Sequence, residues 1–188
     1  MKKIYILGNG SFAQEVFEQI IVANQIKNFG GFIILKDDKA FCIGEEGAEA
    51  FTYPPSAQFI LGTANPNWRK KFYNHFLGYY ELNINHWPNM AAPNSYQSLS
   101  STIGIGNLFL MFSLVNANTQ MGNFNLLCIF TSISVNCSIR NHNVLSPYSS
   151  ISKNVCIENG NLLESGEILF EDLESGCILT NGVVYAND

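Results

Sequence analysis

The sequence is poor in charged residues, which make up 13% of its 188 residues. This share is about half of what globular domains usually carry. The formal net charge is -5, and no segment longer than three residues is rich in lysine and arginine. Nucleic acids and anionic membranes attract proteins through clustered positive charge, so neither is expected as the main partner. We expect a small-molecule ligand instead.

Long hydrophobic runs are also missing. No stretch of 18 apolar residues exists, so no segment is expected to span a bilayer. Two lysines precede an apolar run at residues 4–7, but this run is four residues long and ends at a glycine. It predicts a first β-strand rather than a signal peptide, and we expect a cytoplasmic protein.

Side chains that bind metals are few. The five cysteines form no C-x-x-C motif and no metal-site spacing with histidine, and their odd number argues against a complete disulfide framework. The sequence therefore predicts reduced, mostly buried cysteines and no metal site. These cysteines are Cys42, Cys128, Cys137, Cys156 and Cys177.

What the second half does contain is a six-residue repeat of large apolar residues, which we call the interior ladder. Twelve consecutive positions at this spacing are apolar, and chance would produce this on the order of once in ten thousand trials at 47% apolar content. The positions are Ile103, Phe109, Val115, Met121, Leu127, Ile133, Ile139, Leu145, Ile151, Ile157, Leu163 and Leu169.

This spacing is typical of a left-handed parallel β-helix, in which each hexapeptide forms a short strand and a corner. The residue four positions after each ladder residue is mostly small or polar, as the approach to a corner requires. Residues 103–174 predict four coils of 18 residues, stacked at roughly 4.8 Å. Glycine follows the ladder residue only at Gly104 and Gly122, so coils after Gly122 are expected to be less regular. An irregular β-sandwich is the alternative.

The first half predicts a small parallel sheet of Rossmann type. A strand at residues 3–7 is followed by a glycine turn and by helical apolar spacing from residue 12 to 21, with Ser11 and Gln14 as a capping box. Further strands are expected at 31–35 and 58–61, and Pro66 suits the first turn of a helix that extends to Leu77.

The glycine turn of such a sheet is a candidate nucleotide site. Backbone N–H groups at Gly8, Gly10 and Ser11 can approach a phosphate at the start of the helix. Asp37, which follows the second strand and precedes Asp38, can accept hydrogen bonds from ribose or base. A solvated turn is the alternative for both aspartates.

The chain as a whole resembles the sialic acid O-acetyltransferase and UDP-4-amino-sugar N-acetyltransferase family. Four stretches carry the resemblance: G-N-G-S-F-A-Q-E-V from Gly8, I-L-G-T-A-N-P-N-W-R-K-K with Gly62 and Arg69, His86-Trp87-Pro88, and E-D-L-E-S-G-C-I-L-T-N-G at 171–182. The resemblance implies a Rossmann-like nucleotide-sugar-binding domain at residues 1–85, with Gly62 among its binding residues, and a β-helix acyltransferase domain at 86–188.

The resemblance also implies a homotrimer that uses acetyl-CoA as co-substrate. The co-substrate would lie along the β-helix between subunits, with Ser146 and Pro147 among its binding residues. The acyl group would pass to an amine or hydroxyl of a nucleotide-linked sugar or of sialic acid, in surface glycan biosynthesis.

The family's catalytic histidine is missing from this sequence. In the family, a His-Asp-Cys stretch supplies the general base; the matching residues here are Val135, Asn136 and Cys137. Valine cannot accept a proton, and loss of a general base costs about 10²–10⁴ in rate. Phe12 and Gln14 likewise stand where the family often has histidine and lysine.

His142 is the candidate replacement, because it is the only histidine of the repeat region. It lies seven residues after Val135, on the next face of the prism, and the alternative is a surface or corner residue. His86 is expected to be structural, and His75 to belong to a helix.

Two functions therefore remain open: an acyltransferase with an unusual base, and a catalytically silent trimeric relative that binds ligands or acts as a scaffold. A β-helical zinc enzyme is excluded because three histidines from the helix faces are needed. An ice-binding β-helix is excluded because Thr102, Thr119 and Thr131 form no regular rank.

Overall fold

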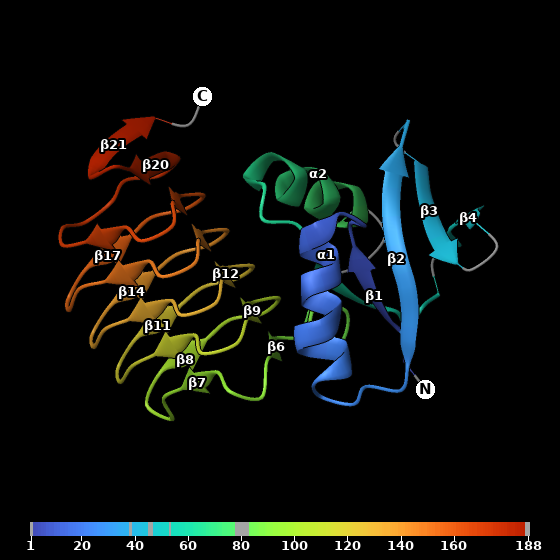
Figure 1. The fold of residues 1–188 in the computed structure, drawn as a ribbon, viewed down its shortest axis with the longest axis horizontal. Helices are drawn as coiled ribbons and strands as arrows, with labels where there is room; N and C mark the ends of the chain where they lie inside the picture. The colour runs from blue at the N-terminus through green and yellow to red at the C-terminus, as the bar shows by residue number, and fades with distance from the viewer. Residues whose placement is uncertain (1, 38, 45–46, 53, 78–82, 187–188) are drawn as a thin grey trace.

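The computed structural model describes residues 2–37, 39–44, 47–52, 54–77 and 83–186. Figure 1 shows two parts side by side: a twisted sheet with helices, and a stack of short strands that rises from β6 and β7 to β20 and β21. Within the described ranges, no helix has the length and hydrophobicity that a bilayer crossing demands.

The N-terminal part contains a five-stranded mixed sheet in the order β4-β3-β2-β1-β5, in which β2, β1 and β5 are parallel. Its elements in chain order are β1 (Ile4–Leu7), α1 (Ser11–Val16) continued by the π-helical η1 (Phe17–Val22), β2 (Phe29–Lys36), β3 (Lys39–Gly44), β4 (Gly47–Ala50), β5 (Gln58–Leu61) and α2 (Pro66–Leu77). The expected strands, glycine turn and helices are therefore present.

Two details of that prediction are wrong. The sheet is not wholly parallel, because β3 and β4 extend it as antiparallel strands. Strands in such a hairpin at a sheet edge need no long apolar run, so the sequence pattern did not reveal them. The capping box is also absent: Gly10 is the N-cap residue, and no side chain among the described residues caps the helix. Ser11 is already the first helical residue.

The start of α2 agrees with the prediction and identifies its cap. Pro66 is the first helical residue, where its missing N–H costs nothing. The Asn65 side chain accepts a hydrogen bond from the backbone N–H of Trp68 at 3.1 Å. Asparagine in this position satisfies one of the free N–H groups at a helix start.

The C-terminal part is a parallel β-solenoid with three faces. The first face is built by β6 (Met90–Ala91), β9 (Leu108–Phe109), β12 (Leu126–Leu127), β15 (Val144–Leu145) and β18 (Leu162–Leu163). The second is built by β7 (Tyr96–Gln97), β10 (Leu114–Val115), β13 (Ser132–Ile133), β16 (Ser150–Ile151) and β19 (Ile168–Leu169), and the third by β8 (Thr102–Ile103), β11 (Gln120–Met121), β14 (Ser138–Ile139) and β17 (Cys156–Ile157).

The interior ladder is confirmed as the core of this solenoid. Its residues from Phe109 to Leu169 are buried in one cluster, and Ile103 packs against them at partial exposure. The coils begin at Met90, before the predicted start of the repeat at residue 103. The sequence pattern did not reveal this first turn, because the two preceding ladder positions hold Ala91 and Gln97 rather than large apolar residues. The second face contains five strands, one for each turn of the solenoid.

The coils after Gly122 are regular, contrary to expectation. Strands pair with a step of 18 residues as far as Ser150 with Ile168. Only the last turn is shorter, since Leu162 pairs with Ile178. The hairpin of β20 (Cys177–Thr180) and β21 (Val183–Ala186) then ends the stack, as the top of Figure 1 shows.

The N-terminal part packs on the first face of the solenoid. The outward residues of this face are apolar, and Leu108, Leu126 and Val144 are buried in one cluster with Val16 and Ile20 of the α1–η1 helix. At the same position the third face presents polar or small side chains, such as Ser138, and the second face presents both apolar residues and serines, such as Ser132. The hydrophobic effect therefore selects the face that the helix covers.

Candidate functional site

The glycine turn lies beside a pocket of about 500 Å³, which we call the glycine-turn pocket. Four of the five predicted substrate-binding residues line it together: Gly8, Gly10, Ser11 and Gly62. Trp68 and Phe72 of α2 close one side, and residues of β2 the other. The pocket thus lies at the carboxyl ends of the parallel strands, where open α/β sheets usually bind ligands.

Two glycines of this pocket are required by close backbone approach. Gly8 has a φ of 124°, and a Cβ there would lie 2.8 Å from the Gly62 carbonyl oxygen. A Cβ on Gly62 would lie 2.3 Å from a methyl carbon of Ile6. Larger residues therefore cannot occupy either position without displacing the strands.

Asp37 is the predicted substrate residue that does not line the pocket. It is exposed in the turn after β2, with a φ of 48°, and its neighbour Lys36 lines the pocket instead. Asp38 lies outside the described residues. Phe12 is half-buried, lines the pocket and packs on the helix core, whereas Gln14 is exposed.

The solenoid has three corners, each marked by a column of residues with positive φ. We name them the Phe124 corner (Phe124, His142, Gly160, Gly176), the Phe130 corner (Phe112, Phe130, Tyr148) and the Asn136 corner (Asn118, Asn136, Asn154). Val135 lies on the Asn136 corner, His142 on the Phe124 corner, and Ser146 and Pro147 immediately before Tyr148 on the Phe130 corner. Within one chain, these candidates therefore lie on three different corners.

The Asn136 corner has no proton acceptor of ordinary basicity at the family histidine position. Val135 is 37% exposed, and the Asn136 side chain joins a ladder of amides with Asn118 at 3.2 Å and Asn154 at 3.3 Å. Cys137 is buried, and burial raises the pKa of its thiol. Neither the amide nor the neutral thiol replaces a histidine base here.

His142 lines a second cavity, of about 490 Å³, between α2 and the Phe124 corner; we call it the α2–corner cavity. The imidazole stacks on Phe124 with 5.3 Å between ring centroids and contacts Tyr73 edge to face at 4.8 Å. His142 is thus a half-buried corner residue whose ring lines a cavity. Sequence reasoning identified this histidine but had no signal for its cavity, because α2 is more than 60 residues away in the chain.

The environment of His142 keeps it neutral. Burial lowers its pKa to about 4, and the positive charges of Arg69 and Lys70 contribute to the same shift. At neutral pH the ring therefore has a lone pair available to accept a proton. A base with such a low pKa is, however, weaker than one matched to the working pH.

Arg69 is a fully buried cation that sequence reasoning treated only as a family match. Its guanidinium donates to the Leu61 carbonyl oxygen at 3.2 Å, to that of Thr63 at 2.9 Å and to that of Phe124 at 2.8 Å. It thereby ties the end of β5 to the Phe124 corner. Burial lowers its pKa to about 10, which leaves it charged at neutral pH.

The Phe130 corner carries three exposed aromatic rings beside Ser146 and Pro147. Phe112 and Phe130 stack at 4.9 Å, and Phe130 and Tyr148 stack at 5.1 Å. Ser146 and Pro147 are both half-buried, and the Pro147 carbonyl oxygen accepts a hydrogen bond from Gly166. This corner offers an apolar, accessible edge.

The remaining candidates occupy the surroundings of these pockets. His86 approaches the Pro55 carbonyl oxygen at 3.2 Å at the junction of the two parts, and His75 lies on α2 against Phe76.

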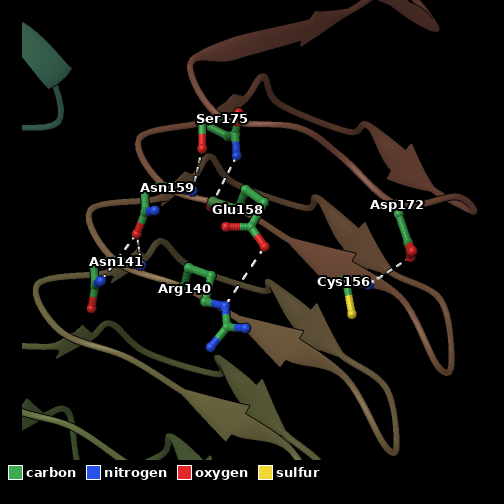
Figure 2. Close-up of polar contacts among 8 residues, drawn as sticks. Arg140, Asn141, Cys156, Glu158, Asn159, Asp172 and Ser175 are labelled. Carbon is green, nitrogen blue, oxygen red and sulfur yellow. Dashed lines mark hydrogen bonds and ion pairs between the residues drawn. The ribbon is translucent and has the colours of Figure 1, made fainter.

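All five cysteines are free, but only Cys128 and Cys137 are buried, so the expectation of mostly buried cysteines is wrong; Cys156 is exposed. Its backbone N–H donates to Asp172, as Figure 2 shows.

Comparison with known proteins shows that this chain is similar to solved structures in its fold. No protein-family model matches the sequence, and no curated protein is significantly similar to it. Solved structures do match. A variant of perosamine N-acetyltransferase from Caulobacter crescentus, in complex with CoA and GDP-perosamine, matches with a TM-score of 0.73 and 14% identity, over 98% of this chain and 96% of that one.

Two further structures match to a similar extent. The acetyltransferase domain of PglB from Neisseria gonorrhoeae FA1090, in complex with acetyl coenzyme A, has a TM-score of 0.70 and 15% identity, over 98% of both chains. WeeI from Acinetobacter baumannii AYE has a TM-score of 0.67 and 14% identity, over 98% of this chain and 99% of that one. The chain therefore shares the fold of these proteins along nearly its whole length.

Proposed function

We propose that this chain transfers an acyl group, with acetyl as the first candidate, from acyl-CoA to an amine or hydroxyl of a nucleotide-linked sugar or sialic acid in surface glycan biosynthesis. The observation that carries the proposal is the fold shared over 98% of the chain with perosamine N-acetyltransferase and with the acetyltransferase domain of PglB. One of these was solved with CoA and GDP-perosamine, the other with acetyl coenzyme A.

The nucleotide part of the acceptor is assigned to the glycine-turn pocket. Gly8, Gly10 and Ser11 place backbone N–H groups at the start of α1, where an anionic phosphate is stabilised. Gly62, which follows the neighbouring strand β5, packs without a side chain against β1 and so lets the second wall of the pocket lie close to the glycine turn. Asp37, exposed beyond the end of β2, can accept a hydrogen bond from ribose or base at the pocket's rim.

Acyl-CoA is assigned to the Phe130 corner, at Ser146 and Pro147. The exposed edge of Tyr148 supports this assignment, because the apolar arm of a pantetheine chain needs such a surface. The proposal includes a homotrimer of cytoplasmic subunits, a Rossmann-like domain at 1–85 and a left-handed β-helix at 86–188. In a trimer, corners that are separate within one chain come together between neighbours.

His142 is the proposed general base. An acceptor amine or hydroxyl attacks the thioester carbonyl, the carbon–sulfur bond breaks, CoA leaves as the thiol or thiolate, and the proton of the nucleophile passes to a base. His142 is neutral and faces a cavity of about 490 Å³, which is large enough for a sugar. Val135 leaves no base at the family position.

The test is release of free CoA by the purified chain. Acetyl-CoA would be incubated with UDP-, dTDP- and GDP-linked amino sugars and with sialic acid, and product formation would be followed by mass spectrometry. We expect turnover with at least one acceptor and a loss of about 10²-fold or more in His142→Phe, which keeps the stack on Phe124 but removes the base. His75→Phe, on α2, is the matched control and should keep its activity.

A second candidate function is a catalytically silent binding or scaffolding protein. Val135, the amide ladder at Asn136 and the low pKa of His142 favour it. This candidate predicts that calorimetry detects acetyl-CoA or a nucleotide sugar while no CoA is released with any acceptor. Turnover that disappears in His142→Phe would exclude it.

A further inference from the structure

The α2–corner cavity exists because the aromatic stack of the Phe124 corner ends at His142. Phe124 and His142 lie parallel, with 6° between their rings. The next two residues of the column are Gly160 and Gly176, with φ of 73° and 69°, and a Cβ on either would contact no atom of the described residues within 4 Å. Two missing side chains thus leave open space directly above the imidazole.

The charge around this cavity has one sign. Arg69 and Lys70 of α2 line it, and among the described residues no carboxylate belongs to its lining. This is unusual in a chain of net charge -5, because cations are in the minority. Arg69 is 2% exposed; within the described part of the chain, its terminal nitrogens donate only to carbonyl oxygens, and its Nε is buried without a hydrogen-bond partner. An unpaired buried cation next to a cavity favours an anionic ligand.

The rest of the lining suits the organic part of such a ligand. Tyr73 and His142 give aromatic surface, and Asn159 and Ser175 on the solenoid side offer amide and hydroxyl groups. Figure 2 shows the side chains of Asn159 and Ser175 above Asn141 in one column. The volume of about 490 Å³ exceeds what a lone phosphate ion would fill.

We propose that the α2–corner cavity binds a small phosphorylated metabolite, with the phosphoryl group at Lys70 and Arg69 and the organic part against Tyr73 and His142. This site is separate from the glycine-turn pocket, which uses Trp68 and Phe72 on another face of α2. It uses the same cavity in which the proposed function places the acceptor sugar beside His142, and it goes beyond that function by assigning a phosphoryl site at Lys70 and Arg69.

Two variants and one control test the proposal by calorimetry on the full chain. The probes are glucose 1-phosphate and, as the uncharged comparison, glucose. We expect glucose 1-phosphate to bind and glucose not to bind. Lys70→Gln should weaken binding by roughly fivefold, since one charge-assisted contact is lost. Lys71→Gln, which removes the next lysine of α2 from outside this cavity, should leave the affinity unchanged.

Gly160→Phe fills the cavity and should abolish binding. The corner accepts this side chain, because Phe124 has the same backbone conformation in the same column, with a φ of 58°. Circular dichroism and a melting curve check the fold; if this variant does not fold, Lys70→Gln decides alone.

Several results would overturn the proposal. With the wild-type chain, these are no binding of glucose 1-phosphate, or equal binding of glucose. With the variants, they are an unchanged affinity in folded Gly160→Phe or in Lys70→Gln. Loss of binding in Trp68→Ala would also overturn the proposal, because it would place the ligand in the glycine-turn pocket. Acyl transfer without phosphate binding here would refute this inference alone, and binding here without any acyl transfer would refute only the proposed function.

Discussion

Replacement of Asn125 by leucine tests what holds the coils of the solenoid in register. Asn125 is fully buried and belongs to a column of asparagines that repeats once per coil: Asn89, Asn107, Asn125, Asn143 and Asn161. Its side-chain oxygen accepts a hydrogen bond from the Asn143 backbone N–H at 2.9 Å. Its amide donates to the Arg140 carbonyl oxygen at 2.9 Å and to the Asn107 side chain at 3.1 Å.

The size of the effect follows from these bonds. In Asn125→Leu, the Asn143 N–H and the Arg140 carbonyl lose their partners inside the protein, at about 1–3 kcal/mol each. Burial of the leucine side chain offsets part of this cost, so we expect a loss of about 3 kcal/mol in unfolding free energy. For a chain of this length, that corresponds to a fall in Tm of about 6–12 °C.

The measurement is a thermal melt followed by circular dichroism, with urea unfolding as a second readout. The control is Asn136→Gly on the exposed amide ladder, where glycine retains the positive φ and water replaces the lost bonds. We expect its cost to stay below about 1 kcal/mol. A loss below that value in Asn125→Leu, or equal losses in both variants, would refute the assignment of the buried column as the main polar link between coils.

Three further predictions concern the pockets. The pKa of His142 falls from 6.5 to about 4 on folding, so between these pH values the unfolded chain binds a proton that the folded chain does not. The free energy of unfolding therefore decreases as pH falls from 6.5 to 4. In urea titrations at pH 7 and pH 4.5, His142→Phe should lose about 2 kcal/mol less of this free energy than the wild type. An identical pH effect in both proteins would contradict this. Gly62→Ala places a Cβ 2.3 Å from Ile6, so it should lower the free energy of unfolding by about 1–3 kcal/mol and with it the Tm. It should also weaken nucleotide-sugar binding at least tenfold, as measured by calorimetry. Gly10→Ala is the control: its Cβ meets no atom of the described residues within 4 Å, and it should preserve the Tm. Val135→His restores the family base and should raise CoA release by about 10²-fold or more if the chain binds both substrates; unchanged turnover with intact binding would show that this corner is not the reactive one.

The interior ladder was predictable because it depends on a local rule. Each hexapeptide places one apolar side chain inside the prism, so Ile133 or Ile157 can be assigned to the core without knowledge of the rest of the fold. The glycine turn was predictable for a similar reason, since Gly8 and Gly10 lie between a strand and a helix that are adjacent in sequence. The first turn of the solenoid was missed because Ala91 and Gln97 break the apolar pattern. The β3–β4 hairpin was missed because antiparallel strands at a sheet edge need no long apolar run.

The sequence alone determined the solenoid, the glycine turn and the absence of a histidine at residue 135, because each depends on residues that are close in the chain or on a fixed period. Tertiary structure alone decided that His142 lies in a cavity, that Arg69 and Lys70 give that cavity its positive charge, and that Val135, His142 and Ser146 lie on three different corners. These facts depend on how α2 packs against the Phe124 corner. Such long-range packing comes from the burial of many apolar side chains at once, and no local spacing in the sequence encodes it.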